Sequence, residues 1–137
     1  MIATAEEFVA LRESSVQEEY LRAARENAPI DVWRDVIARF PHMRKWVALN
    51  KTVPVEILEI LAKDDDRDVR FFVAMKNSLP LHLMVLLSRD QDEGVRMRIA
   101  CNRKVPIDVL RYLSADSSVD VSSAALERLH EKAGYSE

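Results

Sequence analysis

Apolar residues recur along this chain at fixed distances from four prolines. Counted from each proline, positions plus three, plus four and plus seven are apolar, which is the spacing of one face of an α-helix. Proline suits a first helical turn, because it lacks an N–H and already has a helical φ. The pattern therefore predicts a helix starting at each of Pro29, Pro54, Pro80 and Pro106, which are 25 or 26 residues apart.

A second, shorter apolar segment follows each predicted helix. An Asp stands ten residues after each of the last three prolines (Asp64, Asp90 and Asp116), where its carboxylate could cap this second helix. A small alanine recurs within the second segment, where two helices must approach closely. Each unit is predicted to be a helix, a tight turn, a second helix and a turn. Since one unit cannot bury its apolar face alone, the units are expected to stack.

The repeats predict an all-α chain that forms a single α-solenoid domain over residues 1–137. Residues 1–27 are expected to form N-terminal capping helices, residues 28–126 about four repeats, and residues 127–137 a C-terminal cap and tail. At the N-terminus, Thr4 with Glu7 and Ser15 with Glu18 have the spacing of two capping boxes, each opening a helix.

The phrase VALNKTVPVEILEILAKD at positions 47–64, followed by Asp-Val-Arg at 68–70, resembles the leucine-rich repeat variant family, which is related to HEAT-like solenoids. The resemblance covers about residues 23–126. It implies a right-handed superhelix in which α-helices alternate with 3₁₀ or short α-helices. Some members carry an N-terminal cysteine cluster for iron and sulfur, which this chain lacks, so the resemblance implies no cofactor.

The composition is that of a folded soluble domain, with 48% hydrophobic and 31% charged residues. Two glycines are too few for a glycine-rich phosphate loop. The single cysteine, Cys101, indicates a reducing compartment and is expected to be a buried structural thiol. With no secretory signal or membrane-length apolar run, the sequence predicts a cytoplasmic protein that does not bind membranes.

Charge is segregated within the repeat. Segments 43–53, 69–79 and 95–105 contain basic residues and no acidic ones, whereas the segments after them are acidic overall. One interpretation is a stripe that binds a polyanion or an acidic protein surface. The other is a structural ladder in which each arginine pairs with an aspartate of its own or a neighbouring unit; Asp64 lies six residues before Arg70, and Asp90 six before Arg96. The candidate partner-binding residues are Trp46, Arg70, Arg96, Arg98, Arg103 and Lys104.

Catalytic and metal-binding patterns are missing. Asp64, Asp66 and Asp68 alternate like the start of a calcium loop, but Val69 and Met75 replace the required glycine and glutamate. The three histidines have no ligand spacing, and no nucleophile–base pair can be recognised. We expect neither a metal site nor enzymatic activity.

These observations favour a scaffold or adaptor that binds another protein through a concave or basic face, as a monomer or weak oligomer. The alternative is a HEAT-like protein that binds nucleic acid along the basic segments. A further alternative is an adaptor or inhibitor of an enzyme encoded by a neighbouring gene.

Overall fold

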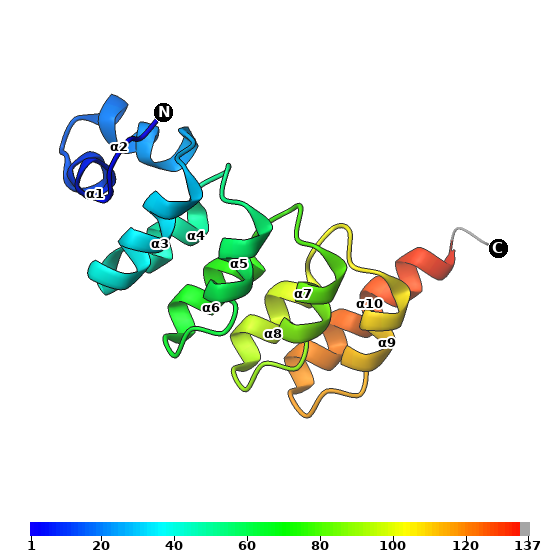
Figure 1. Cartoon of the computed structure of the whole chain (residues 1–137). Coiled ribbons are helices and arrows are strands. Elements are labelled where there is room, and N and C mark those ends of the chain that lie inside the picture. Colours follow the sequence, from blue (N-terminus) through cyan, green and yellow to red (C-terminus); the bar gives the residue numbers. More distant parts are fainter. Residues whose placement is uncertain (135–137) are drawn as a thin grey trace. The chain divides into compact units, whose positions relative to one another are not determined.

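The computed structural model describes residues 1–134, which form ten α-helices, one short 3₁₀-helix and no strand (Figure 1). The predicted all-α class is confirmed. The chain divides into two compact units, an N-terminal unit of residues 1–73 and a C-terminal unit of residues 74–137. The division falls at the end of α6, within the predicted repeats. The last three residues of the predicted tail, 135–137, lie outside the described residues.

The N-terminal unit is built around two fully buried aromatic rings, Phe8 and Trp33, which meet edge to face with centroids 5.2 Å apart. Helix α3 packs on α1 and α5, and α4 contacts α2, α3 and α5. The elements are α1 (Ala5–Glu13), α2 (Gln17–Arg25), α3 (Ile30–Arg39), the 3₁₀-helix (Pro41–Met43), α4 (Arg44–Leu49), α5 (Val55–Leu61) and α6 (Arg67–Ala74).

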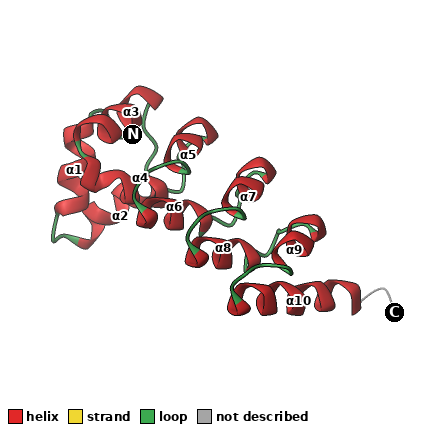
Figure 2. Cartoon of the chain, turned by 90° about the horizontal axis from the view of Figure 1, so that it is seen from below, coloured by secondary structure: helices red, strands yellow, loops and turns green. Residues whose placement is uncertain are grey.

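The C-terminal unit has two layers of helices. It contains α7 (Leu81–Leu87), α8 (Glu93–Ala100), α9 (Ile107–Leu113) and α10 (Val119–Gly134). Figure 2 shows α7 and α9 in one layer and α8 and α10 in the other. The predicted apolar face of α9 is buried at Val109, Leu110 and Leu113, and the matching positions of α7 are buried too. Apolar spacing therefore identified the core side of these helices correctly.

Each of the four prolines is the N-cap of a helix and does not belong to its first turn. Their φ values lie between −57° and −75° and their ψ values between 148° and 160°, so the backbone is still extended at these positions. The proline carbonyl already accepts hydrogen bonds from the N–H groups three and four residues later. The helices thus begin one residue later than the sequence predicted.

The aspartates at plus ten were predicted to be helix caps, and this was wrong. Each accepts, through Oδ1, the backbone N–H two residues further on, at 2.9 Å. The cap lies at that later residue. Asp92, for example, is the N-cap of α8 and accepts the N–H of Val95 at 3.0 Å. The reason is that the turn is two residues longer than expected, with one side chain closing the turn and the next capping the helix.

Of the four residues in the two predicted capping boxes, Thr4 acts as a helix cap. Thr4 accepts the N–H of Glu7 through its hydroxyl at 3.1 Å. The N-cap of α2 is Val16, which has no side-chain cap, so the prediction for Ser15 was wrong. Ser14 instead accepts the N–H of Val16 and donates to Glu19, which fixes the turn before α2 by another route.

Candidate functional site

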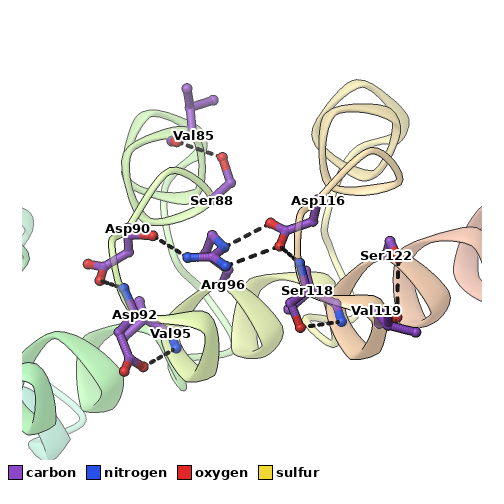
Figure 3. A network of polar contacts seen from close by, with 11 residues as sticks. Val85, Ser88, Asp90, Asp92, Val95, Arg96, Asp116, Ser118, Val119 and Ser122 are labelled. Carbon is purple, nitrogen blue, oxygen red and sulfur yellow. Dashed lines mark hydrogen bonds and ion pairs between the residues drawn. The ribbon is translucent and has the colours of Figure 1, made fainter.

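Arg96 of α8 joins two turns of the C-terminal unit (Figure 3). Its Nη1 donates to the backbone carbonyl of Asp90 at 2.7 Å. Its Nε and Nη2 donate to the two carboxylate oxygens of Asp116 at 2.8 and 3.1 Å. The side chains of Arg96 and Asp116 are only 14% and 6% exposed. The guanidinium therefore connects the α7–α8 turn with the α9–α10 turn through a bidentate ion pair.

The electrostatics of this pair are those of a stable structural contact. Burial alone would raise the pKa of Asp116, but the hydrogen bonds from Arg96 and from the Ser118 N–H, with the charge of Arg96, lower it. The hydrogen bond with Asp116 raises the pKa of Arg96 against the opposing effect of burial. Both groups are therefore held in their charged forms.

The other two aligned arginines are also engaged inside the fold. Arg44 donates from Nε to the Ile37 carbonyl at 2.9 Å and from Nη1 to the Asp64 carboxylate at 3.3 Å. Arg70 is only 6% exposed, and its Nη1 donates to the backbone carbonyls of Asp64 and Asp65 at 2.9 and 3.1 Å. These positions anchor the turns and offer little surface to a partner.

Of the two pairings that the Asp–Arg ladder allowed, these side-chain ion pairs use the aspartate of the neighbouring unit. Where arginine and aspartate lie six residues apart, as in Arg70 with Asp64 and Arg96 with Asp90, the acceptor is the aspartate's backbone carbonyl. In the pairs Arg44–Asp64 and Arg96–Asp116 the carboxylate comes from 20 residues further along the chain. Arg96 thus holds its own turn through the Asp90 carbonyl and the following turn through the Asp116 carboxylate.

A second buried polar position lies four residues before a proline and was not predicted. Asn50 donates from Nδ2 to the carbonyls of Ala23 and Glu26 at 2.8 and 3.0 Å, and its Oδ1 accepts from Thr52. Asn102 donates to the Lys76 carbonyl at 3.0 Å and accepts the N–H of Lys104 at 2.8 Å. Asparagine at the same distance from two prolines was the sequence signal for this role.

Lys76 occupies the corresponding position before Pro80. The side chain is half-buried, and burial lowers its pKa to about 8. An ammonium group loses hydration when it is removed from water, which favours the neutral amine. This lysine belongs to the basic segment 69–79, but its partial burial makes it unlike a solvated surface charge.

The non-aligned basic candidates lie in or just after α8. Arg98 is half-buried in the helix, whereas Arg103 and Lys104 are exposed in the turn before α9. Neither Arg103 nor Lys104 forms an ion pair with any residue in the described part of the chain. Cys101 was expected to be buried and is exposed. Its position is the C-cap of α8, just beyond the buried Ala100, so the side chain has left the core face.

Trp46 of α4 lies in a half-buried cluster of aromatic and cationic groups in the N-terminal unit. Its ring stacks on Phe72 with centroids 6.3 Å apart and an interplanar angle of 26°. The guanidinium carbon of Arg12 lies 3.5 Å from the Trp46 ring centroid and 5.9 Å from that of Tyr20. Lys45 Nζ lies 5.3 Å from the Trp46 centroid. We call Trp46, Phe72, Arg12 and Lys45 the tryptophan cluster.

Arg12 is the member of this cluster that sequence reasoning missed. It stands at the end of α1, far from Trp46 in sequence and outside the predicted repeats. Its guanidinium forms no ion pair with a residue between positions 1 and 134. The cluster therefore holds an oriented cation on an aromatic face, an arrangement that contributes about 0.5–2 kcal/mol depending on desolvation.

Comparisons of the chain with protein-family models, curated proteins and solved structures found no match. Within residues 1–134, no three His, Cys, Asp or Glu side chains are placed to hold a metal ion. No helix in that range is long and apolar enough to cross a membrane.

Proposed function

We propose that this protein is a non-catalytic protein–protein interaction module whose partner docks on the tryptophan cluster. The cluster carries this proposal because tryptophan and arginine are the residues most enriched at interface hot spots. Trp46 is half-buried and fixed by Phe72 on one side, so little side-chain entropy would be lost on binding. The apolar ring and its cationic neighbours together resemble the core of a protein interface.

The partner surface is proposed to be acidic. Arg12 and Lys45 place two positive charges within 3.5 and 5.3 Å of the Trp46 ring centroid. Arg12 has no carboxylate of its own in the described chain, so an incoming Asp or Glu would find its N–H donors available. Charge complementarity of this kind guides encounter and fixes the orientation of the complex.

The proposed architecture is a right-handed α-solenoid of the leucine-rich repeat variant or HEAT-like type, acting in the cytoplasm. Its support lies in the recurrence of one local design: a proline N-cap, an aspartate that closes the turn, and an arginine that reaches the aspartate 20 residues later. Stacked repeats of this kind expose long surfaces, and binding is their usual use.

The test begins with capture of a partner by the full chain, followed by measurement of its affinity with purified components. Trp46→Ala is expected to weaken binding about thirtyfold, the effect of removing a hot-spot residue. Arg12→Glu is expected to weaken binding at least as much, because it reverses the charge on the ring. Circular dichroism must first show that both variants fold.

Arg34→Ala is the matched control. This arginine is also in the N-terminal unit and is 56% exposed; among residues 1–134 it contacts no aromatic ring, and its ion-pair partner is Asp31 at 3.9 Å. Its affinity for the partner should equal that of the parent chain. A partner bound equally by the parent, Trp46→Ala and Arg12→Glu proteins would remove the tryptophan cluster from the interface.

Nucleic-acid binding is the second candidate, favoured by the exposed Arg103 and Lys104. Two phosphate contacts would give a slope of about −2 in log affinity against log salt. Retention of the parent chain on DNA or RNA at low salt, lost in an Arg103→Ala/Lys104→Ala variant, would support this function. Lack of retention at low salt would exclude it.

A further inference from the structure

The C-terminal unit contains a cleft that is not part of the tryptophan cluster. Its volume is about 420 Å³, and it is bounded by Arg89 and Asp116 of the α7–α8 and α9–α10 turns, by Arg96 of α8, and by Arg111 and Tyr112 of α9. It lies at the N-terminal end of α8, whereas Arg103 and Lys104 follow the C-terminal end of that helix. The cleft is therefore a separate place from the basic residues singled out in the sequence.

Arg96 and Asp116, which form part of the cleft wall, are already paired with each other. Arg96 uses Nε and Nη2 on the carboxylate of Asp116 and Nη1 on the carbonyl of Asp90 (Figure 3). A guanidinium occupied on all three nitrogens is a rigid structural element. Asp116, in turn, is neutralised by Arg96 and does not present a free negative charge to a ligand.

Arg89 is different, because it forms no ion pair with a residue that the structure describes. Its guanidinium carbon lies 5.1 Å from the ring centroid of Tyr112, which is 51% exposed. Stacking on a ring orients the planar guanidinium while leaving the N–H donors at its edge available. This is the same device that holds Arg12 on Trp46 in the N-terminal unit.

Arg111 supplies a second available cation. Among the described residues its ion-pair partner is Asp108, at 3.6 Å, and the side chains of this pair are 72% and 93% exposed. An ion pair so exposed is weak and screened by solvent. A ligand carboxylate in the cleft could replace Asp108 as the partner of Arg111 at little cost.

We propose that this cleft binds the carboxylate of a single Asp or Glu side chain from an acidic segment of the partner protein. Three arginines and two aspartates line the cleft and leave one net positive charge, which suits a monoanion. A phosphate monoester carries about −1.5 to −2 charges at neutral pH and would leave negative charge unmatched beside Asp90 and Asp116. The exposed face of Tyr112 offers apolar contact to the methylene groups of the bound side chain.

This assignment rests on the proposed function in one respect, the identity of the ligand as part of a partner protein. The carboxylate chemistry of the cleft can be tested without that partner. The probes are the peptides acetyl-Gly-Glu-Gly-amide, its Gln counterpart and its phosphoserine counterpart. The protein is the full chain labelled with ¹⁵N. The readout is the NMR shift of the arginine Nε–Hε groups and of the amides of Ala115 and Ser117, which also line the cleft.

The Glu peptide should produce saturable shifts at Arg89 and Arg111, and the Gln peptide should produce none. Arg89→Gln and Arg111→Gln should each weaken binding of the Glu peptide about tenfold, the effect of losing one charge-assisted contact. Tyr112→Ala should also weaken it, since Arg89 loses its support. Arg34→Gln, in the N-terminal unit, should leave the titration unchanged.

Equal shifts with the Glu and Gln peptides, or shifts confined to residues outside the cleft, would overturn the proposal. Tighter binding of the phosphoserine peptide would overturn the choice of a carboxylate. The two proposals fail separately. A partner that requires Trp46, together with a cleft that ignores the Glu peptide, would leave the proposed function standing and remove only this inference.

Discussion

Equivalent positions in the two units perform the same task with different strength. The Asp–Arg contact is stronger in the C-terminal unit, where Arg96 makes two bonds to Asp116, than in the N-terminal unit, where Arg44 makes one bond of 3.3 Å to Asp64. The order reverses at the buried asparagine, since Asn50 donates two hydrogen bonds and Asn102 one. The repeat therefore prescribes a contact without fixing its strength.

The weaker arginine contact has a local cause. Helix α3 runs to Arg39 and is followed by a 3₁₀-helix, whereas α7 ends at Leu87 and leads into an aspartate-closed turn. Ten residues after Pro29 the chain has Arg39, and no aspartate is available there to close a turn. Arg44 takes the Ile37 carbonyl instead and remains more exposed, at 30%, than Arg96, at 14%. The difference teaches that turn length controls the geometry of the ion pair.

The largest expected effect comes from removing the carboxylates. Asp116→Ala should lower the free energy of unfolding by about 3 kcal/mol, because it leaves a buried guanidinium without its counter-charge. Asp64→Ala should cost about 1.5 kcal/mol, since its partner is more exposed and singly bonded. Urea unfolding followed by circular dichroism measures both. The control is Asp108→Ala, whose side chain is 93% exposed and should change stability by less than about 0.5 kcal/mol. If Asp116→Ala and Asp64→Ala lowered the free energy of unfolding equally, the Asp–Arg contact would not be stronger in the C-terminal unit.

The asparagines should give the opposite order and a smaller effect. Asn50→Ala should cost about 2 kcal/mol, since it removes the donor to the Ala23 and Glu26 carbonyls, and Asn102→Ala about 1 kcal/mol. Trp33 and Trp46 both lie in the N-terminal unit, so tryptophan fluorescence follows that unit while circular dichroism follows all helices. Asn77→Ala, at an exposed position, is the control. A larger loss for Asn102→Ala would contradict the hydrogen-bond count.

The dependence of stability on pH below pH 5 tests whether the charge of Asp116 stabilises the fold. Its pKa in the folded protein lies below the ordinary value of 3.8, so its stabilising contribution is complete well above pH 4 and is lost as the pH falls through the folded pKa. The stability difference between the parent and Asp116→Asn should therefore narrow between pH 5 and pH 3. Thermal melts at half-unit pH steps measure it. A constant difference would show that the charge of Asp116 does not stabilise the fold.

Lys76 allows a separate test, on the basic side of the stability curve. Its pKa is about 8 in the folded protein against 10.5 for an ordinary lysine, so the unfolded chain binds the proton more tightly. Burial of the charged amine is then unfavourable below pH 8, and stability should rise as the pH increases from 8 to 10.5. The Lys76→Asn variant should lack this part of the rise. Parallel curves for parent and variant would contradict the lowered pKa.

The sequence predicted the helices well and their ends less well. Apolar spacing after the prolines located the core faces of α5, α7 and α9, because that spacing depends only on helix geometry. The caps were misplaced because an aspartate suits either a turn or an N-cap, and the choice depends on the length of the turn. Cys101 was misjudged because one residue past the end of a helix changes which way a side chain points.

The candidate site was harder to predict because its decisive contacts are tertiary. Trp46 was identified from its position in the repeat, but Arg12, on its ring, comes from a helix before the repeats begin. Arg89 and Tyr112 are not unusual in sequence, and only the fold brings them to one cleft. Arg70 and Arg96 were candidates for partner binding, and their hydrogen bonds to the turns before their helices give them a structural use. The repeat period predicted which positions recur in each unit, but it could not predict contacts between side chains that are distant in sequence.

The exposure of Cys101 has a practical consequence. It is the chain's single thiol, so a maleimide dye or spin label would attach at one defined position without any mutation. That position stands at the end of α8, beside Arg103 and Lys104. At 1.5 Å per residue, the eight residues of α8 place its other end, where the cleft lies, about 12 Å away. A label at Cys101 would therefore respond strongly to a ligand on the basic turn and weakly to one in the cleft, so one reagent could distinguish the two.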